Sequence, residues 1–195
     1  ASFAAQVLDL DASVVVRFGH PLDCIGNPVP SDLASRRAAA ASRRRYVSDR
    51  NGVVEPDLQR DRVYTERLAD AIVREYPRSA QVMVTHLVAD ACWTSMERAM
   101  QSDDPYRILR SPIERRQLDE DDLLRLIAQR MSAVESGARD GRWHAELPDT
   151  AEAALGEAIE RFASYHRSRA VARRGEHIVI EDPQLCLYYR NRLLF

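Results

Sequence analysis

The sequence contains no lysine and is poor in cysteine, glycine and tryptophan. Arginine supplies all 28 basic residues of the 195-residue chain, against 30 aspartate and glutamate residues, and the net charge is -2. This balance excludes a general electrostatic attraction to nucleic acid, although local arginine patches remain compatible with it. Nucleic acid is therefore not expected as a partner, and the absence of lysine is typical of codon bias in a GC-rich genome.

Cysteine is too scarce for a disulfide framework. Cys24, Cys92 and Cys186 are odd in number and far apart, which disfavours a disulfide framework or a cysteine metal site and favours a reducing compartment. Long apolar runs are also missing. Because no stretch of roughly 18 apolar residues occurs, no segment is predicted to span a bilayer.

The sequence has no glycine-rich phosphate loop, no nucleophile elbow and no zinc-ligand spacing. His144 and Asp149 form a His-x-x-x-x-Asp spacing, but chance explains such a match and Asp149 is better used as a helix cap. His86 and Asp90 lie one helical turn apart and would suit a base with its orienting carboxylate, or a metal pair. A hydrogen-bonded core histidine is the better interpretation. We therefore predict no catalytic residue, no metal site and no cofactor.

Hydrophobic residues make up 45% of the chain, which is enough to bury a core. The pattern predicts a mainly α chain with a few short strands, of the α+β class. Two short strands, over residues 142–147 and 177–180, are predicted to pair as a small β wing. Four helices are predicted from apolar spacing and end signals: 56–76 before Pro77, 82–100 in the core, 119–137 between Asp119 and Gly137, and 149–175 between Asp149 and Gly175.

Residues 14–18, Val-Val-Val-Arg-Phe, form a β-branched run that ends at Gly19 and predicts a short buried strand. No other strong strand lies nearby, so its sheet would be built by residues before Ala1. The sequence also ends abruptly on Phe195. Together these features predict a piece of a longer protein.

The segment 31–51 is rich in alanine, serine and arginine. A solvated, partly helical linker is the first interpretation. The alternative is an arginine patch that binds phosphate groups or an anionic membrane surface. The residues of this possible patch are Arg36, Arg37, Arg43, Arg44 and Arg45.

Residues 185–195 predict a helix with apolar residues on several sides. Asp182 followed by Pro183 is a helix start signal. Arg190 and Arg192 lie inside this apolar segment, and an unpaired buried charge costs several kcal/mol. We therefore expect an anionic partner for them.

Three segments carry a family resemblance, in matching order along the chain. Residues 187–194 read Leu-Tyr-Tyr-Arg-Asn-Arg-Leu-Leu, residues 14–23 contain Phe-Gly-His-Pro-Leu and are followed by Gly26 and Asn27, and residues 82–96 contain His-Leu-Val-Ala at 86–89. They resemble, respectively, the tyrosine-tyrosine-arginine-asparagine stretch near the C-terminus, the strand and turn after the catalytic motifs, and an apolar helix between them. The family is that of bacterial glycerol-3-phosphate acyltransferases and the related dihydroxyacetone-phosphate acyltransferases.

The resemblance implies the helical C-terminal region of an α/β acyltransferase, with strand 14–18 left over from the catalytic sheet. The parent enzyme would transfer a fatty acyl group from acyl-CoA or acyl-carrier protein to glycerol 3-phosphate in phospholipid biosynthesis. The catalytic motifs of the family precede this region, so the chain alone is expected to be inactive and to need the missing N-terminal catalytic region as a partner. The implied location is cytoplasmic and peripheral, at the inner face of the cell membrane.

On this basis the chain divides into the end of a catalytic domain over residues 1–30, an arginine- and alanine-rich linker over 31–55, and a helical C-terminal domain over 56–195. Substrate or phosphate contacts are assigned to Tyr189, Arg190, Asn191 and Arg192. Two alternatives remain. One is a stand-alone winged-helix-like interaction or nucleic-acid-binding module, and the other is a regulatory domain that binds acyl-carrier protein through the 36–45 arginine patch.

Overall fold

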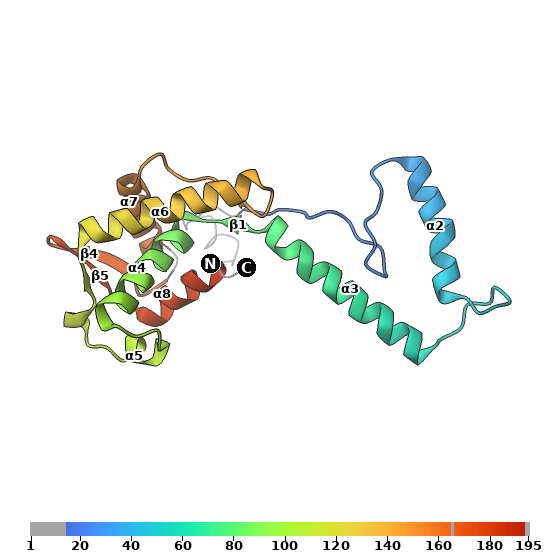
Figure 1. Cartoon of the computed structure of the whole chain (residues 1–195), viewed down its shortest axis with the longest axis horizontal. Helices are drawn as coiled ribbons and strands as arrows, with labels where there is room; N and C mark the ends of the chain where they lie inside the picture. Colours follow the sequence, from blue (N-terminus) through green and yellow to red (C-terminus); the bar gives the residue numbers. More distant parts are fainter. Residues whose placement is uncertain (1–14, 165, 194–195) are drawn as a thin grey trace, which may run out of the picture. The chain divides into compact units, whose positions relative to one another are not determined.

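The computed structural model describes residues 15–164 and 166–193 and shows a mainly helical chain with a few short strands (Figure 1). The α+β class predicted from the sequence is confirmed. The chain divides into two compact units, Arg17–Ala80 and the unit that contains Gln81–Phe195. This division differs from the predicted boundaries after residues 30 and 55, because the helix expected to open the C-terminal domain belongs to the first unit.

The first unit contains two helices and the loops before and between them. Helix α2, Leu33–Val47, begins at Asp32, whose carboxylate accepts a hydrogen bond from the Ser35 N–H. None of its residues is buried, in agreement with the interpretation of a solvated, partly helical segment. Helix α3, Leu58–Ser79, begins at Asp57 with the same kind of cap.

Helix α3 does not stop before Pro77, so the predicted end is wrong. It continues to Ser79, and the Ala80 N–H bonds to the Pro77 carbonyl. The proline ring fixes a helical φ, and its missing N–H removes only one hydrogen bond near the end of the helix. Two more residues can therefore follow it.

The strand predicted over residues 14–18 is wrong for the part that the structure describes, and Val14 lies outside that part. Residues 15–20 have no regular secondary structure, and Val16 and Phe18 are 69% and 94% exposed. A strand needs a neighbouring backbone for its N–H and C=O groups. Among the described residues, no strand pairs with this segment.

Helix α4, Val84–Met100, forms the centre of the second unit, as predicted. It packs against α6, Glu120–Arg139, α7, Ala151–Ser164, and α8, Pro183–Arg190, and the short helix α5, Pro105–Leu109, lies near its end (Figure 1). Apolar residues lie all around α4, so it needs cover on several sides. Elements that follow it in the chain provide this cover.

The predicted caps of α6 and α7 had different outcomes. Helix α6 begins at Asp119, as predicted, and the Asp119 carboxylate accepts a backbone hydrogen bond from the first turn. Helix α7 is capped by the Thr150 hydroxyl and not by Asp149. It also ends at Ser164, well before Gly175, so the predicted end is wrong.

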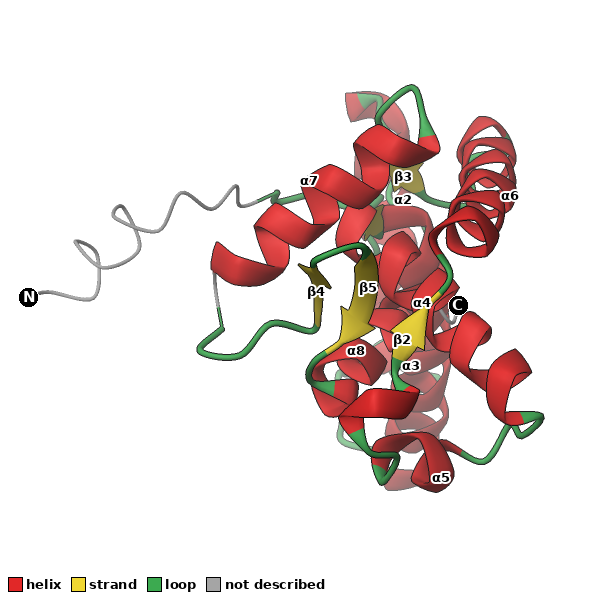
Figure 2. Cartoon of the chain, turned by 90° about the vertical axis from the view of Figure 1, so that its left-hand side faces the viewer, coloured by secondary structure: helices red, strands yellow, loops and turns green. Residues whose placement is uncertain are grey.

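The predicted β wing exists, but its partners differ. Strand β5, His177–Ile180, pairs antiparallel with β4, Val171–Arg174, and with β2, Gln117–Leu118, in the order β2-β5-β4 (Figure 2). The segment predicted as its partner instead contributes β3, His144–Ala145, which pairs in parallel with β1, Gln81–Val82. The predicted pairing is therefore wrong.

The short connection between β4 and β5 explains this outcome. Gly175 and Glu176 join the strands, and Gly175 has a φ of 61°, a left-handed conformation that glycine adopts without steric cost. Closing so short a loop costs less entropy than pairing with a distant segment.

Two short 3-10 helices, η1, Ile113–Arg115, and η2, Asn191–Leu193, follow α5 and α8.

Gly137 packs inside α6 and does not cap it, so that prediction is also wrong. The helix continues to Arg139. The Trp143 indole lies against the glycine, and its Nε1–H donates to the Val134 carbonyl at 2.8 Å. A Cβ at position 137 would lie 2.1 Å from Cζ2 of Trp143, so this contact requires glycine.

Replacing Gly137 by alanine is expected to lower the free energy of unfolding by about 1 kcal/mol. Overpacking costs roughly 1–3 kcal/mol, and the better helix propensity of alanine offsets up to about 1 kcal/mol of it. Urea unfolding followed by tryptophan fluorescence measures the change. The matched control is Gly156→Ala in α7, where an added Cβ meets no atom within 4 Å; equal losses in both variants would contradict the packing explanation.

Candidate functional site

The C-terminal helix α8 lies on α4. It begins as predicted, with the Asp182 carboxylate accepting a hydrogen bond from the Leu185 N–H and Pro183 in the first turn. Cys186 is fully buried, and its Sγ lies 3.6 Å from the Ala89 carbonyl oxygen of α4. Helix α8 is thus held against the core of its own unit.

A cluster of charged groups joins α8, α4 and α6. The Arg190 guanidinium lies between two carboxylates, with Nε 3.5 Å from Asp90 Oδ1 and Nη2 3.4 Å from Glu97 Oε1. Its Cζ is 5.7 Å from the Trp93 ring centroid. Arg130 Nε donates to the other Asp90 oxygen at 2.6 Å. We call these five residues the Arg190 cluster.

The cluster is close to electroneutral, because it has two guanidinium groups and two carboxylates. Glu97 also accepts the Trp93 Nε1–H at 2.8 Å. The prediction that an anionic group answers Arg190 is confirmed, and the group comes from this chain. Contact of Arg190 with a substrate phosphate remains a prediction, since its charge is already balanced by Asp90 and Glu97.

The other residues assigned to substrate contact lie around this cluster. Tyr189 packs edge-on against Phe162, with ring centroids 5.0 Å apart. The exposed Arg192 donates to the Tyr188 hydroxyl at 2.8 Å and lies over its ring. No carboxylate of the described residues pairs with it, so the expected anionic partner of Arg192 is not found in this part of the chain. Asn191 is exposed at the end of α8. The four residues are therefore neighbours in the chain, and none of them is among the described residues that line the cavity beside the cluster.

A cavity of about 350 Å³ borders the cluster at Asp90 and Arg130. Its remaining walls are mostly apolar and comprise Val82, Ala133, Val134, Arg142, Trp143 and Leu193. None of these side chains is a nucleophile or a general base of the usual kinds. The carboxylate on its border, Asp90, is already paired with Arg130 and Arg190, so the cavity offers binding space next to a neutralised ion pair.

His86 is a hydrogen-bonded core histidine, as the preferred interpretation predicted. Its Nδ1 accepts the Met83 N–H at 3.2 Å and so caps the start of α4. Asp90, its proposed partner, is instead paired with two arginines. Burial, with a smaller contribution from the positive charge of Arg192, lowers the pKa of His86 to about 4.

The lowered pKa of His86 makes stability depend on pH. The unfolded chain, with an ordinary histidine pKa near 6.5, binds the proton more readily than the folded chain. The stabilisation from neutral His86 is therefore present above about pH 6.5 and is lost as the pH falls toward 4, by roughly 3 kcal/mol in all.

Denaturant unfolding at pH 7 and pH 4.5 measures this loss, and His86→Asn is expected to show a smaller loss than the unmodified protein. Asparagine can still accept the Met83 N–H but does not titrate. His144→Asn, at an exposed position on β3, is the control. If His86→Asn and His144→Asn leave the pH dependence equally unchanged, the assignment to His86 is wrong.

The other candidate catalytic and metal-binding residues do not form a site in the described part of the chain. His144 and Asp149 are exposed, and their side chains make no hydrogen bond or ion pair within the described chain. No group of His, Cys, Asp and Glu among residues 15–164 and 166–193 is arranged to hold a metal ion. All three cysteines are free, and burial raises the pKa of the Cys186 thiol to about 12.

The predicted arginine patch lies on α2. Arg36 donates to the Pro30 carbonyl and Arg43 to the Ala39 carbonyl. Three further members, Arg37, Arg44 and Arg45, have exposed side chains with no ion pair in the described part of the chain. On the other side of α2, Tyr46 packs edge-on against Tyr64 of α3, with ring centroids 5.8 Å apart.

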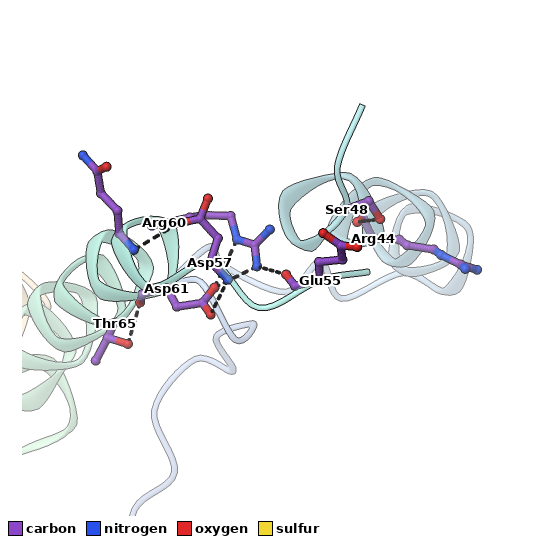
Figure 3. Close-up of polar contacts among 8 residues, drawn as sticks. Arg44, Ser48, Glu55, Asp57, Arg60, Asp61 and Thr65 are labelled. Atoms are coloured by element: carbon purple, nitrogen blue, oxygen red, sulfur yellow. Dashed lines mark hydrogen bonds and ion pairs between the residues drawn. The ribbon is translucent and has the colours of Figure 1, made fainter. Parts of the chain in front are cut away.

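The connection from α2 to α3 is held by local hydrogen bonds (Figure 3). The Ser48 hydroxyl donates to the Arg44 carbonyl at 2.8 Å. Arg60 donates to the Glu55 carbonyl at 2.6 Å and pairs with Asp61 at 3.0 Å. These contacts order the turn without using the α2 arginine side chains.

Sequence reasoning missed Asp90 and Glu97 as the carboxylates that pair with Arg190, and Arg130 as the second arginine paired with Asp90. A signal was present, because Asp90, Thr94 and Glu97 recur on one face of an otherwise apolar helix.

No helix among the described residues is long and apolar enough to cross a membrane. Comparison with protein families, curated proteins and solved structures finds no match to this chain.

Proposed function

We propose that this chain is the C-terminal, non-catalytic helical portion of a glycerol-3-phosphate O-acyltransferase-like enzyme. The observation that supports it best is the contact between two segments that carry the family resemblance. Residues 82–96 lie mainly in α4 and residues 187–193 in α8 and η2. Arg190 of the second segment pairs with Asp90 of the first, and with Glu97 directly after it. The two segments that carry the family resemblance thus pack against each other.

In this proposal the chain completes and stabilises the fold of the enzyme, and the missing N-terminal region carries the chemistry. Acyl transfer from acyl-CoA or acyl-carrier protein to a hydroxyl needs a general base beside the acceptor. Neither histidine considered as a candidate base is placed for this role: His86 is half-buried and caps α4, and the side chain of His144 is exposed with no hydrogen bond or ion pair in the described chain. Acceptor activation is therefore assigned to residues upstream.

The reading frame upstream of Ala1 tests the proposal. It is expected to encode a His-x-x-x-x-Asp block and a Pro-Glu-Gly block, and its full product is expected to form lysophosphatidate from glycerol 3-phosphate and acyl-CoA or acyl-carrier protein. The present chain alone is expected to form none. A stop codon directly before Ala1, or an inactive full product that is correctly folded, would exclude the proposal.

We assign the peripheral contact with the inner membrane face to α2 and the turn after it. Four arginines of α2 are exposed: Arg36, Arg37, Arg44 and Arg45. In the turn that follows and at the start of α3, Val53, Val54 and Leu58 are 51%, 56% and 90% exposed. Basic charge next to exposed apolar side chains favours binding to an anionic bilayer surface. The cytoplasmic location of the protein is part of the same proposal.

Sedimentation with phosphatidylglycerol-rich vesicles tests this contact. Replacing Arg36, Arg37, Arg44 and Arg45 by glutamate is expected to weaken binding by at least about tenfold, because each arginine near the surface contributes about 1 kcal/mol. Vesicles of phosphatidylcholine are the control. If the variant instead loses only binding to acyl-carrier protein, the patch is a protein-binding surface.

The winged-helix alternative has weaker support. A β hairpin does lie beside helices, but Arg173 pairs with Glu120 and Arg174 with Glu181. The first turn of α6 also contains three acidic residues. This surface is therefore poorly suited to phosphate contacts, and salt-dependent DNA binding would have to be observed to restore the alternative.

A further inference from the structure

A second, more polar hollow lies where α4 ends and α5 and η1 follow. It has a volume of about 360 Å³. Arg107 and Arg110 reach it from α5 and its end, and Arg115 reaches it from η1. The other lining residues are Met100, Asp104, Tyr106, Ser111 and Pro112. Three arginines from one short stretch of chain therefore surround a single hollow.

These arginines have no ion-pair partner among the described residues, unlike those of the Arg190 cluster. The side chains of Arg107, Arg110 and Arg115 are exposed and make no hydrogen bond or ion pair with any described residue. Asp104 is the one carboxylate in the lining, and its Oδ1 accepts the Tyr106 N–H. The acidic neighbours Asp103 and Glu114 do not line the hollow. The lining thus has a net positive charge.

The backbone that carries Arg115 is firmly held. Arg116, next to Arg115, donates from Nε to the Ser111 carbonyl at 2.8 Å and from Nη1 to the Glu181 carbonyl at 3.2 Å. The Ile180 N–H donates to the Arg116 carbonyl at 3.1 Å. The segment 111–116 is therefore tied to strand β5, and a ligand would not need to order it.

We propose that this hollow binds an organic phosphate monoester. Guanidinium groups bind phosphate oxygens through paired hydrogen bonds, and several of them match the charge of a dianion better than that of a carboxylate. A water molecule occupies about 30 Å³ in the liquid, so the hollow has room for a phosphate and several carbon atoms. Met100, Tyr106 and Pro112 supply apolar surface for the carbon part. This site is independent of the acyltransferase proposal.

Amide chemical shifts of the ¹⁵N-labelled full chain, titrated with phenyl phosphate, test the site. Saturable shifts are expected over residues 104–116, with affinity about tenfold higher than for benzoate because of the second negative charge. Arg110→Ala is expected to lower the affinity about tenfold, and Arg110→Lys by less because the charge is kept. Arg139→Ala, at an exposed arginine with no described ion pair, is expected to change nothing.

Vesicles that contain phosphatidic acid distinguish the source of the phosphate. If the ligand is a lipid headgroup, they produce the same shifts, and Arg110→Ala removes them. If it is a soluble phosphate, only phenyl phosphate does so. Absence of saturable shifts in residues 104–116 with both probes, or equal weakening by Arg139→Ala and Arg110→Ala, would overturn the proposal.

Discussion

Replacing Asp90 by asparagine is expected to lower the free energy of unfolding of the second unit by about 3 kcal/mol. The Asp90 side chain is 12% exposed and faces both Arg130 and Arg190. Asparagine keeps the shape but removes the charge, which leaves two partly buried guanidinium groups with Glu97 as the remaining carboxylate of the cluster. Breaking a buried ion pair in this way costs roughly 3–5 kcal/mol, and partial exposure of Arg130 places this case at the lower end. Urea unfolding followed by tryptophan fluorescence measures the loss.

The control for this experiment is Asp121→Asn, at an exposed carboxylate in the first turn of α6. Its effect is expected to stay within about 0.5 kcal/mol. A double-mutant cycle with Arg190→Met separates the Asp90–Arg190 interaction from the loss of Arg130 pairing. If Asp90→Asn is as mild as Asp121→Asn, the cluster does not stabilise the fold.

Replacing Phe162 by alanine is expected to cost about 4 kcal/mol. The side chain is fully buried, and its ring contacts Tyr189 of α8 edge-on at 5.0 Å. Truncation to alanine leaves a cavity and removes the aromatic contact that holds α8 against α7. Phenylalanine-to-alanine changes at such sites cost roughly 3–5 kcal/mol.

Phe18→Ala is the matched control, because Phe18 is 94% exposed. Its effect is expected to be within about 0.5 kcal/mol. Thermal and urea unfolding of both variants give the comparison. A loss below about 1 kcal/mol for Phe162→Ala would show that α8 and α7 relax into the space, and the proposed packing of Tyr189 would then need revision.

Local patterns in the sequence were sufficient for the main helices. The apolar surface around α4 identified it as central, and Asp119 and Asp182 marked the starts of α6 and α8. These signals lie within a few residues of the structure that they determine. The same is true of His86, whose partner Met83 is three residues away.

Features that depend on distant partners were not predicted. Val15, Val16 and Phe18 have the composition of a strand, yet no described strand pairs with them. Strand β5 pairs with β4 and β2, and its pairing could not be read from its own residues. For Arg190, the need for an acid was predictable from burial, but the choice of Asp90 and Glu97 depends on how α8 packs on α4.

The position of α8 on α4 is expected to matter while the protein is still being synthesised. The contact between Cys186 and Ala89 joins residues 97 positions apart. During the synthesis of the intervening chain, Glu97 has no guanidinium partner from α8, and the apolar surface of α4 lacks part of its cover. Chaperones are therefore expected to bind nascent chains stalled before residue 183 and to release them once α8 has emerged.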